Sequence, residues 1–410
     1  MDTPQSERLH IVFAGCRNAG KSSLVNAMAG QQVSIVSDVP GTTTDPVAKA
    51  VEIPGLGPCI LTDTAGLDDA GVLGPSRLEK ARARIAESDI VVLVCSGSPE
   101  ALPLEQALAK DLERSGKPFV AVLGKSDLLE DPAARAGEVA ASLGATPLPV
   151  SAVTGDGIGE LFSALLEKVP QDFGARSLLG GLAGRGDLVV LVMPQDSEAP
   201  KGRLIMPQVQ VLRELLDAGG TSVCCTPDTF AATLEALSRK PELVIVDSSV
   251  FAAVAPMVPS GTRLTSFSVL MAAYKGDIGY FVSSASAIGR LVPGDRVLIA
   301  ESCSHVPLGE DIGRVKIPNL LRKYLGERYP DRPRDSILSF DIVSGRDFPS
   351  DLHPYALVIH CGGCVFSRRH LLARVESARR QGVPMTNYGI AIAFLKGILP
   401  KVAIPEDVAN

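Results

Sequence analysis

The residues best suited to chemistry stand in two groups that lie far apart in this sequence of 410 residues. The first group is GCRNAGKS, which fits the pattern G-x-x-x-x-G-K-S. In that pattern, glycines let backbone N–H groups curl around phosphate oxygens, a lysine adds positive charge, and a serine hydroxyl ligates Mg²⁺. The residues at these positions are Gly15, Gly20, Lys21 and Ser22. The stretch therefore predicts a site for nucleotide phosphates.

Two later stretches fit the moving parts of a nucleotide switch. DVPGTTTDPV, residues 38–47, has three threonine hydroxyls and suits a loop that becomes ordered on Mg²⁺ and the γ-phosphate. CILTDTAGLDD follows, in which Asp63 is placed to hold the Mg²⁺ shell and the N–H of Gly66 to reach the γ-phosphate. Each motif is weak alone, but together they indicate a switch.

The base is expected to be guanine. In PFVAVLGKSDLL, Lys125 and Asp127 resemble the Lys-x-Asp of the guanine-reading N-K-x-D motif. A carboxylate at Asp127 can accept hydrogen bonds from the guanine N1–H and exocyclic amine, and adenine offers no matching donor pair. The motif's Asn is replaced by Gly124, which removes an amide that usually ties the base loop to the phosphate loop. We expect this change to affect nucleotide affinity more than base identity.

The second group consists of ESCSHVP and VIHCGGCVF, residues 301–307 and 358–366. Both stretches follow apolar runs that predict strands, and strand ends of an α/β sheet meet at one edge. Their potential ligands are Cys303, His305, His360, Cys361 and Cys364. Gly362 and Gly363 leave the backbone bare, so that their N–H groups can point at sulfur.

Four interpretations of these cysteines compete. Cys-Gly-Gly-Cys is a poor sequence for a strand or helix interior, which disfavours merely buried thiols. A thioredoxin-like dithiol gives no role to Cys303 or the histidines, and structural zinc prefers a second closely spaced pair. An iron–sulfur cluster with three thiolates and one weaker or exchangeable site accounts for the odd number of cysteines and the glycines. We favour the cluster.

These groups need elements that position them, and the sequence predicts an α/β chain throughout. An apolar run before Gly15 predicts a strand, and Leu24, Val25 and Met28 share one face of a predicted helix. A glycine-rich connection at 171–187 marks a boundary, after which three apolar runs alternate with two helical patterns and predict a small parallel sheet. From about residue 266 the pattern is mixed α/β.

Cys224 and Cys225 are adjacent within one of these predicted strands. Neighbouring side chains of a strand point to opposite faces, which argues against a shared metal. We interpret both as small buried apolar residues.

Composition limits the classes of partner and the cellular compartment that we expect for the protein. The chain is 46% hydrophobic and 21% charged, with a net charge of −6 and no long basic run, so nothing favours a nucleic-acid partner. Its apolar runs are far shorter than the roughly 20 residues of a membrane helix, and its start lacks a signal-peptide pattern. Eight cysteines are too few for a disulfide scaffold. We expect a cytoplasmic protein.

Over about residues 9–169 the sequence resembles the Era/TrmE branch of GTPases, through NAGKSS, PGTT and DTAGLDD. The resemblance implies catalytic roles for Lys21, Thr43, Asp63 and Gly66, with Ser22, Thr43 and Asp63 at Mg²⁺. It also implies K⁺ beside Asn18. Its implied nucleotide contacts are Gly15, Asn18, Ala19, Gly20, Lys21, Ser22, Ser23, Lys125, Asp127, Ser151 and Ala152. Leu67 replaces the water-orienting Gln of Ras-like enzymes, so hydrolysis is expected to be slow and to depend on K⁺ or on a rearranged switch.

The whole chain resembles the HydF family of [FeFe]-hydrogenase maturation GTPases, because C-x-H and H-C-x-x-C follow such a GTPase and a small α/β module. The resemblance implies a homodimer whose subunits have a GTPase domain at 1–172, a dimerisation domain at 173–265 and a [4Fe-4S] domain at 266–410. It implies Cys303, Cys361 and Cys364 as cluster thiolates, with His305 and His360 as possible ligands of cluster or cargo.

In that family, the protein binds and hydrolyses GTP and carries a diiron subcluster precursor as cargo. Two radical-SAM maturases and the apo-[FeFe]-hydrogenase are its partners. The alternative is a GTPase that modifies tRNA or senses redox state with a structural metal site. The acidic balance and the internal cysteine pattern disfavour the tRNA function.

Overall fold

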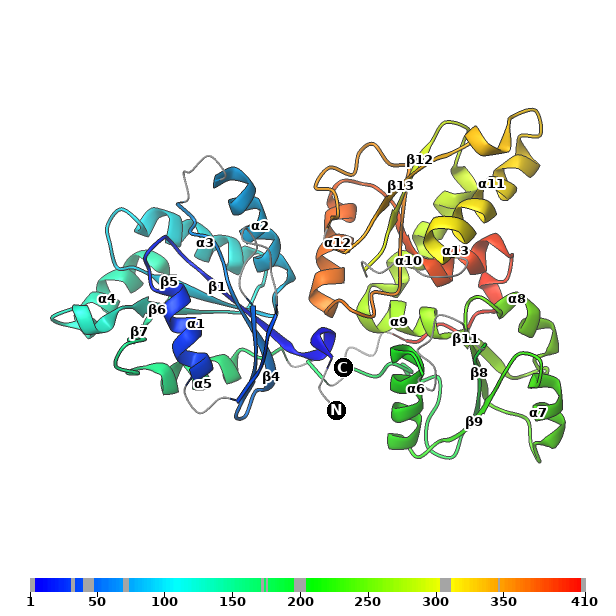
Figure 1. Ribbon diagram of the computed structural model, residues 1–410, viewed down its shortest axis with the longest axis horizontal. Helices are drawn as coiled ribbons and strands as arrows, with labels where there is room; N and C mark the ends of the chain where they lie inside the picture. Colours follow the sequence, from blue (N-terminus) through cyan, green and yellow to red (C-terminus); the bar gives the residue numbers. More distant parts are fainter. Residues whose placement is uncertain are drawn as a thin grey trace. The chain divides into compact units, whose positions relative to one another are not determined.

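The computed structural model describes residues 4–30, 34–39, 48–68, 74–170, 173–174, 176–194, 204–302, 311–345 and 347–406. The chain forms two compact units, Met1–Ala175 and Arg176–Asn410 (Figure 1). The second unit contains two sheets. The three-domain division with boundaries after residues 172 and 265 stays a prediction.

The first unit is built on one sheet with the strand order β2-β3-β4-β1-β5-β6-β7. Its strands are β1 (Leu9–Ala14), β2 (Ser34–Val39), β3 (Ala48–Ile53), β4 (Gly57–Asp63), β5 (Ile90–Cys95), β6 (Phe119–Gly124) and β7 (Leu148–Val150). All neighbours pair in parallel except β3, which is antiparallel to β2 and β4. The strand β5 reads IVVLVC and is buried along its whole length, as expected for a parallel strand covered on both faces.

Helices cover both faces of this sheet: α1 (Lys21–Gly30), α2 (Gly74–Glu87), α3 (Leu102–Arg114), α4 (Pro132–Leu143) and α5 (Ile158–Glu167). Side chains of β1 alternate between the two faces. Ile11 packs in one cluster with Met28 of α1 and Leu161 of α5. Val12 packs in another cluster with Ile85 of α2. The predicted phosphate loop therefore connects the carboxyl end of a buried strand to the first helix.

The second unit contains two parallel sheets, ordered β11-β10-β8-β9 and β13-β12-β14-β15. The strands of the first are β8 (Leu188–Val192), β9 (Thr221–Cys225), β10 (Leu243–Val246) and β11 (Arg263–Ser266). Those of the second are β12 (Arg296–Ala300), β13 (Ser339–Val343), β14 (Leu357–His360) and β15 (Met385–Asn387). The helices are α6 (Met206–Asp217), α7 (Phe230–Ala236), α8 (Phe251–Val254), α9 (Phe267–Lys275), α10 (Ile278–Ser284), α11 (Ile317–Arg328), α12 (Arg368–Arg380) and α13 (Tyr388–Leu395).

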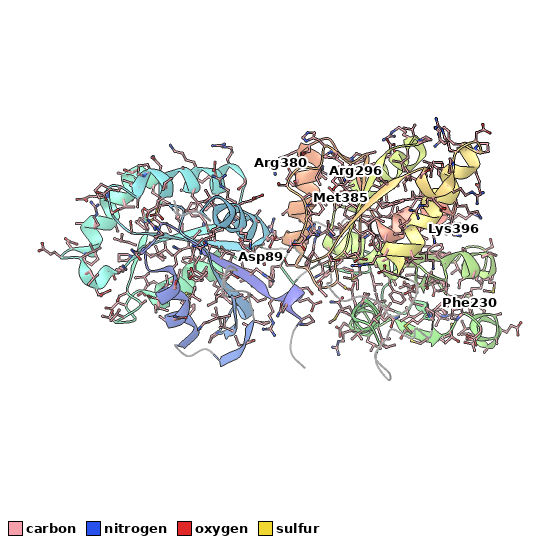
Figure 2. All side chains as sticks on the ribbon, turned by 45° about the horizontal axis from the view of Figure 1, so that its top comes forward. Asp89, Phe230, Arg296, Arg380, Met385 and Lys396 are labelled. Atoms are coloured by element: carbon pink, nitrogen blue, oxygen red, sulfur yellow. The ribbon has the colours of Figure 1, made fainter. Side chains whose placement is uncertain are left out.

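One hydrophobic core joins the two sheets of this unit. Phe230 of α7 and Met385 of β15, both labelled in Figure 2, are fully buried in the same cluster. Val244 of β10 and Val358 of β14 belong to it as well. The helix α9 follows β11 directly, because the Ser266 hydroxyl at the end of that strand caps the helix by accepting from the Val269 N–H.

Two details differ from the sequence-based prediction for the first of these sheets. The sheet has a fourth strand, β11, whose sequence RLTS lacks an apolar run and was not predicted. Cys224 is exposed, whereas Cys225 packs partly buried against the core, so the prediction that both are buried is wrong for Cys224. The strand β9 lies at the edge of its sheet, where only β8 pairs with it, and Thr221 and Cys224 are its exposed residues. Across the described ranges, we find no helix with the length and apolarity needed to span a membrane.

Candidate functional site

The phosphate loop has the geometry that its sequence predicts. It links β1 to α1, and its two glycines cannot be replaced without strain. A Cβ at Gly15 would lie 2.2 Å from the Val94 carbonyl oxygen, and Gly20 has φ +102°. Asn18 is exposed and also adopts a left-handed conformation, with φ 58°. The loop thus needs tight backbone curvature, which directs N–H groups inward around an anion.

Lys21 is held within the loop that it is expected to serve. Its Nζ donates to the carbonyl oxygens of Gly15 at 3.1 Å and Cys16 at 2.8 Å. Burial lowers the pKa of Lys21, whereas the nearby Asp63 and Asp68 carboxylates raise it. A buried ammonium bound to the loop's own carbonyls is well placed to turn toward an incoming phosphate.

The Ser22 and Asp63 side chains fit a Mg²⁺ site. The Ser22 hydroxyl donates to Asp63 Oδ2, while Asp63 Oδ1 is buried and has no hydrogen-bond partner among the described residues. Burial raises the pKa of Asp63, against the Ser22 hydrogen bond and the Lys21 charge, which lower it. A buried carboxylate oxygen without a partner is costly unless a cation satisfies it. Thr43, the predicted third ligand, lies outside the described residues.

The DTAG segment sits directly on the phosphate loop. The Leu67 N–H donates to the Gly15 carbonyl at 3.1 Å, and the Arg17 N–H donates to Asp68 Oδ1 at 2.6 Å. A Cβ at Gly66 would lie 2.4 Å from Arg17 Cγ, so only glycine fits there. The structure therefore brings the predicted γ-phosphate sensor, Gly66, against the phosphate loop.

The predicted base-binding residues also come together. Ser151 Oγ donates to Asp127 Oδ1 at 2.6 Å, and Ala152 follows in the same loop. The stem of Lys125 crosses the phosphate loop, since a Cβ at Gly20 would lie 3.6 Å from Lys125 Cγ. These contacts join β6, β7 and the phosphate loop around one expected position for guanine.

Gly124 has a structural role that sequence reasoning did not identify. A Cβ at this position would lie 2.3 Å from the Ala19 carbonyl oxygen and 3.2 Å from Val94 Cγ1. The base loop therefore approaches the phosphate loop by direct backbone packing, where related GTPases use the amide of an Asn. The signal that could have indicated this is glycine itself, which often marks a close backbone approach.

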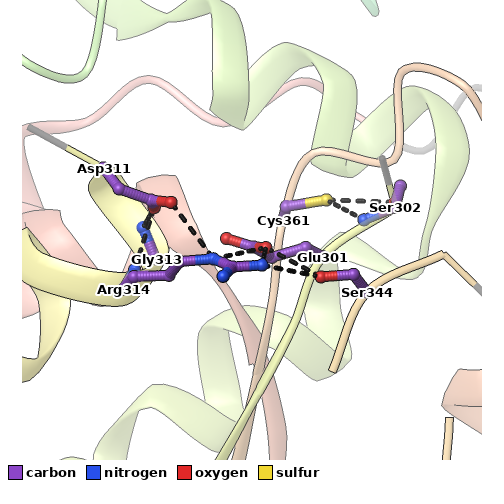
Figure 3. Close-up of polar contacts among 7 residues, drawn as sticks. All are labelled: Glu301, Ser302, Asp311, Gly313, Arg314, Ser344 and Cys361. Atoms are coloured by element: carbon purple, nitrogen blue, oxygen red, sulfur yellow. Dashed lines mark hydrogen bonds and ion pairs between the residues drawn. The ribbon is translucent and has the colours of Figure 1, made fainter. Parts of the chain in front are cut away.

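In the second unit, the two cysteine-bearing strand ends are neighbours. The strands β12 and β14 pair in parallel, with Ala300 opposite His360. The Ser302 N–H donates to Cys361 Sγ at 3.1 Å, and its hydroxyl lies 3.0 Å from the same sulfur (Figure 3). The expectation that these two strand ends meet is thus confirmed for Ser302 and Cys361. Cys303 and His305 lie outside the described residues.

The glycine turn between Cys361 and Cys364 is packed against α9 and, through Leu371, against α12. Gly363 has φ +69°, and a Cβ at Gly362 would lie 3.7 Å from Met271 Cβ of α9. Cys364 packs against the α9 residues around Met271. Burial and the nearby Cys361 raise the pKa of Cys364, and the charge of Lys275 lowers it. Among the described residues, no group of three or more Cys, His, Asp or Glu is arranged to hold a metal ion.

His360 is buried behind the turn. Arg374 Nη1 donates to His360 Nε2 at 2.9 Å, and because arginine only donates, the proton of the neutral imidazole must sit on Nδ1. Nδ1 lies 2.8 Å from the Cys361 carbonyl oxygen, to which it donates. Burial and the Arg374 charge lower the pKa of His360 to about 3. Both ring nitrogens are therefore engaged within the protein.

An ionic network joins Glu301, which follows β12, to Asp311 and Arg314. Arg314 reaches Glu301 Oε2 at 3.3 Å and Asp311 Oδ2 at 3.3 Å, and Ser344 donates to the same Glu301 oxygen at 3.1 Å (Figure 3). The N–H groups of Gly313 and Arg314 in turn bind Asp311. This network fixes the residues on both sides of 303–310. Sequence analysis missed it, because its members are spread over more than 40 positions.

Family models match along nearly the whole chain. Residues 178–276 match the Hydrogen maturase F dimerization domain, and residues 279–405 match the Hydrogen maturase F tetramerization domain. Residues 10–147 match the 50S ribosome-binding GTPase family.

The chain belongs to the HydF family. It is a GTPase with the HydF architecture, in which a P-loop GTPase domain precedes α/β domains, as predicted. The HydF domain models support oligomerisation, and the GTPase domain supports GTP and Mg²⁺ as ligands.

Curated relatives match less than half of the chain and are GTPase-domain homologues. The tRNA modification GTPase MnmE of Nitrosospira multiformis is 37% identical over 164 residues, which are 40% of this chain and 35% of the relative. MnmE of Psychrobacter sp. is 38% identical over 174 residues, or 39% of this chain and 37% of the relative. The match thus spans about a third of the length of these relatives.

Solved structures give a similar but weaker likeness. The G domain of the T. maritima FeoB iron transporter is 25% identical, with a TM-score of 0.31, and covers 40% of this chain and 99% of that one. Era of Aquifex aeolicus is 21% identical with a TM-score of 0.33, covering 53% and 91% of the two chains.

Proposed function

We propose that this chain is a GTP-switched scaffold and carrier that completes a diiron subcluster and transfers it to an apo-[FeFe]-hydrogenase. The observation that carries this proposal is the contact between Ser302 and Cys361 Sγ, which joins the two cysteine motifs at one sheet edge. Membership of the HydF family supports hydrogenase maturation as the setting. The proposal goes beyond family membership in three features: the cluster, the assembly of the diiron subcluster on this chain, and its transfer.

In this proposal, Cys361, Cys364 and Cys303 are the thiolates of a [4Fe-4S] cluster. The described residues fit such a group because Cys361 Sγ already accepts from Ser302 and because the turn carries glycines in place of side chains. A cluster held by three thiolates supplies one open iron, on which a cargo can bind and leave. Water, a carboxylate, His305 or the cargo could fill that position. We assign His360 to positioning, since Arg374 and the Cys361 carbonyl occupy its nitrogens.

The GTPase domain supplies the switch. We propose that Ser22, Thr43 and Asp63 hold Mg²⁺, and that Asn18 helps to hold K⁺ beside the phosphates. With Leu67 in place of a water-orienting Gln, hydrolysis is expected to be slow without K⁺. Steady-state turnover in K⁺ and in Na⁺ at equal ionic strength tests this assignment, and equal rates would contradict it.

The surface for self-association is proposed on α6 and the neighbouring edge strand β9. The apolar residues exposed at the start of α6 and along it are Leu204, Ile205, Met206, Val209 and Leu216, with exposures of 37% to 57%. Ile205, Val209 and Leu216 share one helical face, at spacings of four and seven. Because this surface lies within the segment that matches a dimerization domain, we assign a second copy of the chain as its partner. A dimerisation domain at 173–265 and a cluster domain at 266–410 remain part of the proposal.

The proposed partners are two radical-SAM maturases and the apo-hydrogenase, with no nucleic acid or membrane involved and a cytoplasmic location. The test is hydrogenase activation: the protein is isolated after coexpression with both maturases and then mixed with apo-hydrogenase. The proposal predicts hydrogen evolution from this mixture, and none when the maturases are omitted. Loss of activation in Cys361→Ser, with GTP hydrolysis retained, would support the assigned site. Activation that is unchanged in Cys361→Ser would contradict it.

A further inference from the structure

The carboxylate of Asp68, two residues after the DTAG motif, is bound to Arg17 of the phosphate loop. The backbone N–H of Arg17, inside the loop, donates to Asp68 Oδ1 at 2.6 Å. The guanidinium of the same residue approaches the other oxygen, with Nε 3.6 Å from Oδ2. Arg17 thus binds this carboxylate with backbone and side chain together, as phosphate loops bind anions.

The carboxylate is held there by its segment. The Leu67 N–H binds the Gly15 carbonyl at 3.1 Å, and both the N–H and the hydroxyl of Thr64 donate to the Phe13 carbonyl, at 3.3 and 2.8 Å. Residues 64–68 therefore run along the end of β1 and across the start of the phosphate loop. Gly66 lies so close to Arg17 that a Cβ at position 66 would be 2.8 Å from the backbone nitrogen of Arg17.

The carboxylate is also charged. Partial burial raises the pKa of Asp68, but the hydrogen bond from the Arg17 N–H and the guanidinium charge lower it below its ordinary value. Burial lowers the pKa of Lys21, and the Asp68 charge is one of those that raise it; burial raises the pKa of the Cys16 thiol, with smaller contributions from Glu105 and Asp68. The phosphate loop thus already faces an anion supplied by its own chain.

We propose that Asp68 is an internal competitor of the γ-phosphate and sets the preference of the site for GDP over GTP. The segment that carries Asp68 is the one that senses the γ-phosphate in switch GTPases. A γ-phosphate brought beside this carboxylate would repel it and take its place on the loop. GTP binding must then release Asp68 from Arg17, and by reciprocity the contact weakens GTP binding.

The test compares Asp68→Asn with the wild-type full-length chain. Affinities for a non-hydrolysable GTP analogue and for GDP are measured with Mg²⁺ by fluorescence titration. Asn keeps the size of the side chain but loses its charge. We expect the Kd for the GTP analogue to fall by about three- to tenfold, as for loss of a partly exposed charge contact, with the Kd for GDP changing by less than about twofold.

Arg17→Ala is the second variant, because it keeps the backbone N–H and removes the guanidinium. It should shift the GTP-analogue affinity in the same direction by a smaller factor. Asp111→Asn is the matched control, since Asp111 forms an exposed ion pair with Arg114 at 3.5 Å on α3 of the same unit. This control should leave both affinities unchanged.

The other outcomes overturn the proposal. Unchanged or weaker binding of the GTP analogue by Asp68→Asn would show that the carboxylate does not compete. Equal tightening for GDP and for the GTP analogue would show that competition is not with the γ-phosphate. A fall in the single-turnover hydrolysis rate with unchanged affinities would make Asp68 a catalytic group instead.

Discussion

Arg374 donates a hydrogen bond to His360 at 2.9 Å and thereby fixes which ring nitrogen carries the proton. Arg374 is itself held in place, because its Nη2 donates to the Gly345 carbonyl at 2.6 Å. Its Cζ also lies 4.7 Å from the ring centroid of Phe348 and 4.6 Å from that of Phe366. The remaining N–H of His360 binds the carbonyl of Cys361. The helix α12 thus orients the backbone of a proposed cluster ligand through one buried imidazole.

His360→Ala is predicted to lower the free energy of unfolding by about 1–3 kcal/mol, because it removes a fully buried imidazole together with its hydrogen bond from Arg374. The measurement is denaturant unfolding. His353→Ala is the control, since His353 is 71% exposed and pairs with the exposed Asp351; it should change stability by less than about 0.5 kcal/mol. After cluster reconstitution, the wild type and His360→Ala are compared by pulsed EPR. We expect no coupling to an imidazole nitrogen that is present in the wild type and absent from the variant. Such a coupling would make His360 a ligand.

Gly124→Asn is predicted to weaken nucleotide binding, although it restores the residue of the common motif. The new Cβ would meet the Ala19 carbonyl at 2.3 Å, so the base loop and phosphate loop must move apart. Overpacking of this kind costs about 1–3 kcal/mol, and if that cost falls on the nucleotide-bound state, GDP affinity drops by about five- to 150-fold. Gly137→Asn on α4 is the matched control, because a Cβ there meets no atom within 4 Å. Tighter GDP binding by Gly124→Asn would contradict the packing argument.

Asp63→Asn is predicted to stabilise the Mg²⁺-free chain at neutral pH while slowing GTP hydrolysis by about 10²-fold. Burial raises the pKa of Asp63, so the folded wild type favours the protonated carboxyl. Its stability relative to the variant therefore falls as the pH rises from the unfolded pKa to the raised folded pKa. The advantage of the variant should therefore grow from about pH 4 upward and disappear when Mg²⁺ binds the wild type.

Thermal unfolding of both proteins over a pH series, with and without Mg²⁺, measures this difference. The exposed Asp111→Asn should follow the wild type throughout. A wild type that unfolds above the variant at neutral pH without Mg²⁺ would show that the Asp63 carboxylate is not an unsatisfied buried charge.

Val209→Asp is predicted to weaken self-association by about tenfold or more, because it places a charge within the proposed apolar interface of α6. Light scattering over a range of protein concentrations measures the shift. Leu104→Asp is the control, since Leu104 is similarly exposed, at 41% against 45% for Val209, but lies on α3 of the first unit. If both variants associate like the wild type, the interface lies elsewhere.

Local sequence signals predicted much of both units. The phosphate loop, the Asp63 position and the strand ends before Ser302 and Cys361 follow from short motifs and apolar runs, which depend on neighbouring residues. The strand β11 was missed because its sequence RLTS offers no such run. Its pairing with β10 defines it instead.

Contacts between distant positions could not be predicted in the same way. The pair of Arg17 and Asp68 is separated by 51 positions, and no local pattern shows that the two residues meet. The orientation of His360 depends on Arg374, which is placed by the packing of α12. Cys224 was wrongly predicted to be buried because sequence alone does not show which strand lies at a sheet edge.

The central claim is that the Cys361 edge of the second unit holds a [4Fe-4S] cluster. Its most direct test is EPR of the full-length protein, purified anaerobically, reconstituted with iron and sulfide, and reduced. The account predicts the signal of a reduced [4Fe-4S] cluster, which Cys361→Ser loses while GTP hydrolysis continues. A colourless, EPR-silent protein that retains zinc after the same treatment would contradict it.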